Sequence, residues 1–139
     1  MMDQQGEFCM IVDDEPDMLW VLENLLARQG LTAKKALSGR QALQLIESYR
    51  FKMAFIDLKL PDMDGFELAH HIKSKDPDTC VVLISGYFYK NEQKVLAAID
   101  EGLICDFISK PFSHEDIRRA LSRSPLVEPR GAKSEESVP

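Results

Sequence analysis

The sequence predicts a doubly wound α/β fold, in which a five-stranded parallel sheet carries helices on both faces. Short apolar runs alternate with amphipathic stretches from residue 8 to about residue 122. Several of these runs are continuously apolar, which is typical of parallel strands that are covered on both faces. Because parallel strands need right-handed helical crossovers, this alternation favours one open sheet with helices on either side.

Five runs are expected to form the strands. Each ends where charged, small or turn-forming residues begin, and the second is more polar than the others. The expected strands span residues 8–12, 31–37, 52–58, 80–85 and 104–109.

The stretches between the runs repeat apolar residues at helical spacing. Pro16 suits the first turn of the first helix, where its missing N–H costs nothing, and Gly30 ends the pattern as a C-terminal cap. Ser38, with Gln41 three residues later, is a capping-box signal for the second helix, and Ser113 is the expected N-cap of the last. The other two helices are expected over about residues 66–76 and 91–101.

Composition favours a single domain with a well-packed core. The chain has 139 residues, of which 45% are apolar and 29% charged, unlike the composition of disordered chains. Its net charge of −6 argues against direct nucleic-acid binding by this domain, which would rely on Lys and Arg. Since no apolar stretch approaches a membrane span and the first residues do not resemble a secretory signal, we expect a cytoplasmic protein without membrane contact.

The chain is expected to divide into three parts. Residues 1–7 are polar and acidic and are expected to form a flexible N-terminus. Residues 8–123 are expected to form the folded domain. Residues 124–139 are rich in Pro, Ser, Glu and Lys without apolar periodicity, so we expect a disordered tail or the stub of a linker.

Two residue types carry expectations about packing. Cys9, Cys80 and Cys105 lie in or beside apolar runs without CxxC spacing, so buried free thiols are favoured over zinc ligands or a disulfide. Trp20, on the first helix, is expected to be partly buried.

Polar residues with reactive side chains stand at the carboxyl ends of four expected strands, where open α/β sheets bind their ligands. They are Asp13 and Asp14 after the first strand, Asp57 at the third, Ser85 at the fourth and Lys110 after the fifth. Three neighbouring carboxylates repel one another unless a cation is bound or their pKa values rise. Oxygen ligands with open coordination positions suit Mg²⁺, which shares its shell with phosphate groups.

This set of side chains predicts phosphoryl chemistry. The metal would screen phosphoryl oxygens from the carboxylates, while Lys110 would supply a second positive charge and Ser85 a hydrogen bond. We expect Asp57 to attack phosphorus and form an aspartyl phosphate.

These residues resemble the receiver domain of two-component response regulators. Four short motifs carry the resemblance: an acidic pair, a phosphoacceptor segment, a hydroxyl followed by a small residue, and a lysine followed by a proline that is cis in that family. They are Asp13-Asp14, Asp57 within residues 55–65, Ser85-Gly86 and Lys110-Pro111-Phe112. The resemblance covers about residues 8–122 and implies the flavodoxin-like (βα)5 receiver fold.

The resemblance implies a phosphorylated signalling module rather than an enzyme with a separate substrate. Asp57 would accept a phosphoryl group from a sensor histidine kinase or a phosphotransfer protein, and the domain would catalyse its own phosphorylation and dephosphorylation. Asp14, Asp57 and the backbone carbonyl of Lys59 would ligate Mg²⁺, with Asp13 acting through water.

The resemblance also implies a conformational switch. Ser85 would move toward the phosphoryl group and Phe107, three residues before Lys110, would turn inward. This change would remodel the face made by the fourth helix, fifth strand and fifth helix, which would contact an output domain, a downstream protein or a second copy of the chain. Lys59 and Tyr87, two residues beyond the acceptor and the hydroxyl, would flank the approach of hydrolytic water.

Three alternative interpretations remain beside this one. A small Mg²⁺-dependent phosphatase of the haloacid dehalogenase type also uses an aspartyl nucleophile, but that family expects a second Asp where this chain has Lys59. A flavodoxin-like cofactor binder needs a phosphate-cradling loop after the first strand, where Asp13, Asp14 and Glu15 would repel phosphate. A pseudo-receiver that only binds partners is disfavoured by the complete set of acids, hydroxyl and lysine.

Overall fold

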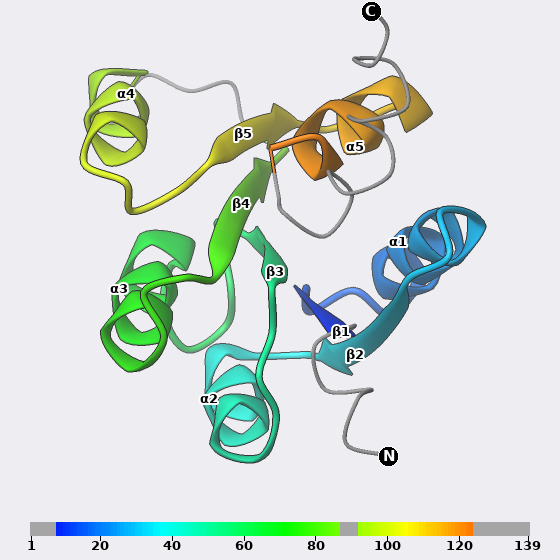
Figure 1. Cartoon of the computed structure of the whole chain (residues 1–139), viewed down its shortest axis with the longest axis horizontal. Helices are drawn as coiled ribbons and strands as arrows, with labels where there is room; N and C mark the ends of the chain where they lie inside the picture. The colour runs from blue at the N-terminus through cyan, green and yellow to red at the C-terminus, as the bar shows by residue number, and fades with distance from the viewer. Residues whose placement is uncertain (1–7, 87–91, 124–139) are drawn as a thin grey trace, which may run out of the picture.

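The computed structural model describes residues 8–86 and 92–123, in which strands and helices alternate along the chain (Figure 1). The strands are β1 (Phe8–Val12), β2 (Thr32–Ala36), β3 (Met53–Asp57), β4 (Cys80–Ser85) and β5 (Asp106–Ser109). The helices are α1 (Pro16–Arg28), α2 (Gly39–Ser48), α3 (Gly65–Lys75), α4 (Glu92–Asp100) and α5 (His114–Leu121).

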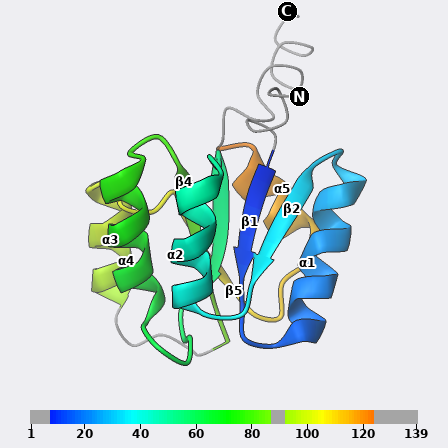
Figure 2. The same ribbon diagram turned by 90° about the horizontal axis from the view of Figure 1, so that it is seen from below.

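The strands form one parallel sheet in the order β2-β1-β3-β4-β5. Helices α1 and α5 cover one face of the sheet, and α2, α3 and α4 cover the other (Figure 2). The predicted doubly wound fold is therefore confirmed. The strand order reverses between β1 and β3, which is where open sheets of this class place their ligands.

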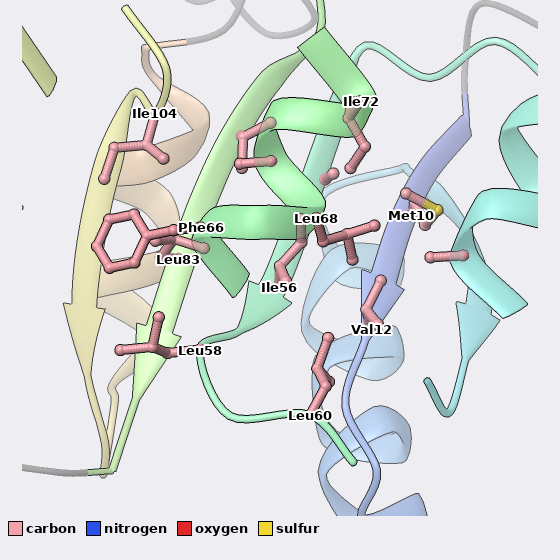
Figure 3. Packing of buried hydrophobic residues seen from close by; sticks show 14 of the residues in the cluster. Met10, Val12, Ile56, Leu58, Leu60, Phe66, Leu68, Ile72, Leu83 and Ile104 are labelled. Atoms are coloured by element: carbon pink, nitrogen blue, oxygen red, sulfur yellow. The ribbon is translucent and has the colours of Figure 1, made fainter. Parts of the chain in front are cut away.

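Alternating side chains of the central strands fill two hydrophobic clusters. In β3, Ala54 and Ile56 belong to the cluster beneath α2, α3 and α4, which Figure 3 shows. Met53 and Phe55 of the same strand belong to the cluster beneath α1 and α5. Every residue of β3 and β4 is buried, because helices cover both faces, and this double burial explains their continuously apolar sequence.

The second and fifth strands are shorter than the apolar pattern predicted, because pairing with a neighbour sets their ends. Ala36 makes the last pair of β2 with β1, and Asp106 makes the first pair of β5, with Val82. Ile104 lies outside β5 but is buried beneath α4, so its apolar character serves packing instead of the sheet.

Polar side chains begin three of the helices. The Ser38 hydroxyl accepts the N–H of Gln41 at the start of α2, and Ser113 forms a reciprocal capping box with Asp116 in α5, as predicted for both serines. The carboxylate of Asp64 caps α3. These caps hold the helix starts close to the carboxyl edge of the sheet.

Two expectations about packing are wrong. Cys80 and Cys105 form a disulfide, and only Cys9 is a buried free thiol among the described residues. Cys80 begins β4 and Cys105 directly precedes the neighbouring β5, so the sheet register brings their Cα atoms to 5.8 Å. Trp20 is 64% exposed, because the buried residues of α1, including Leu19 and Leu22, occupy its other side.

Some expectations lie outside the described residues: the flexible N-terminus at 1–7, the position of Tyr87, and the tail at 124–139. Across the part of the chain that is described, no helix combines the length and apolar character needed to cross a bilayer.

Candidate functional site

The predicted acidic residues meet at the carboxyl edge of the sheet, between β1 and β3. Asp57 is the last residue of β3, and Asp13 and Asp14 directly follow β1. Because Val12 pairs with Ile56 in the adjacent parallel strand, the chain leaves both strands at the same level. One carboxylate oxygen from each of the three aspartates lies within 4.8 Å of the other two. The fold therefore assembles the predicted carboxylate cluster.

Lys110 reaches this cluster from the end of β5. Its backbone N–H donates to the carbonyl oxygen of Ser85 at 2.8 Å, and its peptide bond to Pro111 is cis. Its Nζ lies 3.2 Å from Oδ2 of Asp13 and 3.7 Å from Oδ2 of Asp57. Burial works to lower the pKa of the Lys110 ammonium, but the charges of the two carboxylates outweigh it and raise that pKa above its usual value.

The surroundings of Asp57 disfavour its negative charge. Burial raises the pKa of its carboxyl to about 6, and the charge of Asp13 adds to the rise. The charge of Lys110 and the backbone N–H of Lys59 oppose it. A cation bound beside Asp57 would favour the ionised form that a nucleophile requires.

Asp13 and Asp14 play different structural parts. Asp13 is buried, with Oδ1 accepting the N–H of Glu15 at 2.9 Å and Oδ2 accepting from the Lys110 ammonium. Asp14 is exposed. Protein groups therefore occupy both oxygens of Asp13, whereas the Asp14 carboxylate faces solvent and is available to a cation.

An open cavity of about 590 Å³ lies at the carboxylate cluster. Its volume accommodates a phosphoryl group with a hydrated divalent cation. The described residues that line the cavity do not include Asp13. The lining residues are Asp14, Glu15, Asp57, Lys59, Leu60, Pro61, Gly86 and Lys110. The donor set around this cavity is oxygen-rich and open, which fits Mg²⁺.

The predicted hydroxyl and aromatic residues lie on strands beside Asp57. Ser85 is buried at the end of β4, directly after Ile84, which pairs with Asp57. Phe107 lies in β5, half-buried against the hydrophobic cluster beneath α4. At Gly86, the next position after the hydroxyl, an added Cβ would lie 3.6 Å from Cδ of Lys110, an ordinary van der Waals distance, and would meet no closer atom of the described residues.

Sequence reasoning missed two contributors to the site. The N–H of Glu15 orients Asp13, and Gly65 lets α3 begin directly against the end of β3. A Cβ at Gly65 would lie 2.9 Å from Cα of Leu58 and 3.0 Å from the carbonyl oxygen of Asp57. The Asp64-Gly65 pair, interpreted as turn chemistry, is the signal that could have revealed this close approach.

Comparison with known proteins identifies the family. Residues 9–122 match the family model described as the response regulator receiver domain, so the chain belongs to this family. It is a signalling module of two-component systems, and its cluster of Asp13, Asp14 and Asp57 fits the phosphorylation site of such a domain.

Similar proteins carry the same domain in different contexts. The nitrogen assimilation regulatory protein NtrX of Azorhizobium caulinodans is 39% identical over 75% of this chain and 23% of NtrX. Sporulation initiation phosphotransferase F of Bacillus subtilis is 28% identical over 85% of this chain and 93% of that protein. The signal receiver domain of an HD domain-containing protein from Pseudomonas fluorescens Pf-5 has a TM-score of 0.75 at 29% identity, covering 86% of this chain and 94% of that structure. The chain spans about a quarter of the length of several curated relatives that it matches.

Proposed function

We propose that Asp57 accepts a phosphoryl group in a Mg²⁺-dependent reaction for which the domain itself supplies the catalytic groups. The arrangement of three carboxylates within 4.8 Å, with the Lys110 ammonium 3.7 Å from Asp57, carries this proposal. The phosphodonor is a phosphohistidine on a sensor histidine kinase or a phosphotransfer protein. An oxygen of Asp57 bonds to phosphorus as the P–N bond breaks, and the departing histidine nitrogen takes up a proton.

The residues around Asp57 divide the remaining tasks. Asp14, Asp57 and the backbone carbonyl of Lys59 would hold Mg²⁺, and Asp13 would act through water. The exposure of Asp14 and the two protein contacts of Asp13 support this division. When bound, Mg²⁺ screens the carboxylates from phosphoryl oxygens, and Lys110 supplies the second positive charge beside the attacking oxygen.

We infer that Ser85 and Phe107 convert phosphorylation into a change on the α4-β5-α5 face. A phosphoryl group adds charge and acceptor oxygens close to the end of β4, which biases a two-state element nearby. Leu96 is 60% exposed and Ile99 39% exposed on α4, which supports a contact there with an output domain, a downstream protein or a second copy of the chain.

We propose that Lys59 and Tyr87 set the lifetime of the acyl phosphate. Lys59 is exposed at the cavity, and Tyr87 follows Gly86, which also lines it. Replacement of either side chain by Ala is expected to change the access of water to phosphorus and therefore the rate of dephosphorylation. The measurement is the decay of the phosphorylated species by intact mass after the donor is removed; wild-type decay in both variants would refute the assignment.

The test of the central proposal is incubation with acetyl phosphate and Mg²⁺, followed by intact mass measurement. Wild type and the control Asp100→Ala, which removes an exposed acid on α4, are expected to gain one phosphoryl group. Asp57→Ala, and wild type in EDTA, are expected to gain none. No Mg²⁺-dependent adduct on wild type, or an equal adduct on Asp57→Ala, would overturn the proposal.

A further inference from the structure

The loop between β3 and α3, residues 59–64, is fastened at its base. Leu58 and Leu60, which flank Lys59, are both buried members of the hydrophobic cluster that Figure 3 shows. The N–H of Gly65 donates to the carbonyl oxygen of Leu58 at 2.7 Å. The backbones of Lys59 and Asp64 pair as an isolated antiparallel β-bridge. These contacts close the loop on the strand that ends in Asp57.

The tip of this loop is fastened to a different element, the N-terminus of α2. Oδ1 of Asp62 accepts the N–H of Gly39 at 2.9 Å, and Oδ2 accepts the N–H of Arg40 at 2.8 Å. The first N–H groups of a helix have no partner within it and carry partial positive charge, so a carboxylate is favoured there. The N–H of Gly39 and then that of Arg40 hold the pKa of the Asp62 carboxyl below its usual value.

An apolar contact lies beside this polar one. The side chain of Met63 lies so close to Gly39 that a Cβ on residue 39 would come within 2.6 Å of its sulfur. Met63 also packs against the cluster beneath α2 and α3. Two adjacent loop residues, Asp62 and Met63, therefore attach the loop tip to the start of α2. Asp62 and Gly39 are 23 positions apart along the chain.

We propose that Asp62 is a positioning residue for the phosphorylation site: by accepting two amide N–H groups of α2 it fixes the loop that carries Lys59, whose carbonyl is the proposed Mg²⁺ ligand. Lys59, Leu60 and Pro61 line that cavity with Asp57, so the loop forms one wall of it. Holding a ligand-bearing loop in its binding geometry lowers the ordering cost of cation binding. The inference rests on the proposed function, because it concerns the same cation site.

The experiment compares Asp62→Ala with Ser38→Ala. Both substitutions remove an acceptor from the N-terminus of α2. In the described part of the chain, however, the Ser38 side chain bonds within the first turn of its own helix, where it accepts the N–H of Gln41. The dissociation constant for Mg²⁺ is measured by calorimetry, and folding is checked by circular dichroism. Asp62→Ala is expected to weaken Mg²⁺ binding on the order of 10-fold, whereas Ser38→Ala leaves it within about twofold of wild type. Asp62→Asn, which keeps one acceptor oxygen, is expected to fall between them.

Amide hydrogen exchange in metal-free protein gives a second, independent measurement. Asp62→Ala is expected to speed exchange at residues 59–64 by more than Ser38→Ala does, while β3 stays protected. Wild-type exchange across this loop in Asp62→Ala, or equal weakening of Mg²⁺ binding by Ser38→Ala, would overturn the inference. A wild-type chain that binds no Mg²⁺ would instead refute the proposed function, and the exchange comparison would still decide whether Asp62 holds the loop.

Discussion

Asp57 is a carboxyl group that the folded protein keeps in an unfavourable state. Burial and the charge of Asp13 disfavour its ionisation, and Lys110, 3.7 Å away, only partly compensates. The ionised form of such a carboxyl lowers the stability of the metal-free fold, and a bound cation would stabilise its charge. Perturbed groups of this kind are typical of functional sites. The other members of the site reduce this cost by contacts among themselves, such as that of Lys110 with Asp13.

The raised pKa of Asp57 predicts how stability depends on pH in metal-free protein. Its folded-state pKa of about 6 lies above the ordinary value of 3.8, so the folded protein binds this proton more tightly than the unfolded chain does. The stability that comes from the protonated carboxyl is complete below about pH 4 and is lost as the pH rises through 6. Asp57→Asn carries no charge at any pH. This variant is therefore expected to exceed wild type in free energy of unfolding by about 1–3 kcal/mol at pH 7.5, and by close to nothing at pH 4.

Urea denaturation in EDTA at several pH values measures this difference. Added Mg²⁺ is expected to stabilise wild type at pH 7.5 and to have much less effect on Asp57→Asn, because the variant lacks one carboxylate oxygen ligand. A constant difference between the two proteins from pH 4 to pH 7.5 would show that Asp57 titrates normally.

Among the elements, β3 and α3 pack closely at their junction beside the site. Gly65 begins α3 against the backbone of Leu58 and Asp57, whereas Gly86 follows the end of β4 and, among the described residues, faces the aliphatic part of Lys110. The first contact is with rigid backbone and the second is at ordinary van der Waals distance. The two glycines of the site therefore differ in what they can accommodate.

This difference predicts opposite outcomes for one substitution at two positions. Gly65→Ala is expected to push α3 away from β3, lowering the free energy of unfolding by about 1–3 kcal/mol and weakening Mg²⁺ binding. Gly86→Ala is expected to change stability by less than about 0.5 kcal/mol. Urea denaturation of both variants checks this, and equal stability of the two would contradict the packing argument.

The order and type of the elements could be predicted because each depends on local chemistry. Ser38 and Ser113 cap helices through bonds to residues three positions away, and β3 and β4 are apolar throughout because both faces are covered. The ends of β2 and β5 could not be predicted in this way, since the neighbouring strand determines which residues pair.

At the scale of the whole molecule, two hydrophobic clusters hold the sheet between its helix layers, and one covalent link joins neighbouring strands. The disulfide between Cys80 and Cys105 closes a segment of 25 residues that contains α4. It lies at the start of β4 and next to the start of β5, at the edge opposite Ser85 and Lys110. The link therefore constrains the layer that carries α4 without contacting the carboxylate cluster.

The link predicts a labelling pattern for protein purified without reductant. Alkylation after unfolding is expected to modify one cysteine, Cys9, and all three once the protein is reduced. Reduction is expected to lower the free energy of unfolding of wild type by about 3.5 kcal/mol, the chain-entropy value for a loop of this size. It is expected to leave the stability of Cys80→Ser unchanged, because this variant has no disulfide between residues 80 and 105. Three labels without reductant would show that the two thiols only lie side by side.

The residues of the candidate site could be predicted from their places at strand ends, because parallel strands bring all their carboxyl ends to one edge. Asp13, Asp14, Asp57 and Lys110 meet there as expected. The contact of Asp62 with the start of α2 could not be predicted, because its partners lie 22 and 23 residues away and nothing in the PDMDG segment indicates them.

The acidic residues also show which properties the sequence determines and which the tertiary structure decides. From the chain alone, the net charge of −6 indicates only which partners are disfavoured, while spacing along the chain indicates which aspartates share an edge. Periodicity and caps are local, so they specify the fold class before any distance is known. Which oxygen of Asp13 is occupied, how far Asp57 lies from Lys110, and which cysteines pair all depend on strand register and packing, because these bring together residues that are distant in the chain.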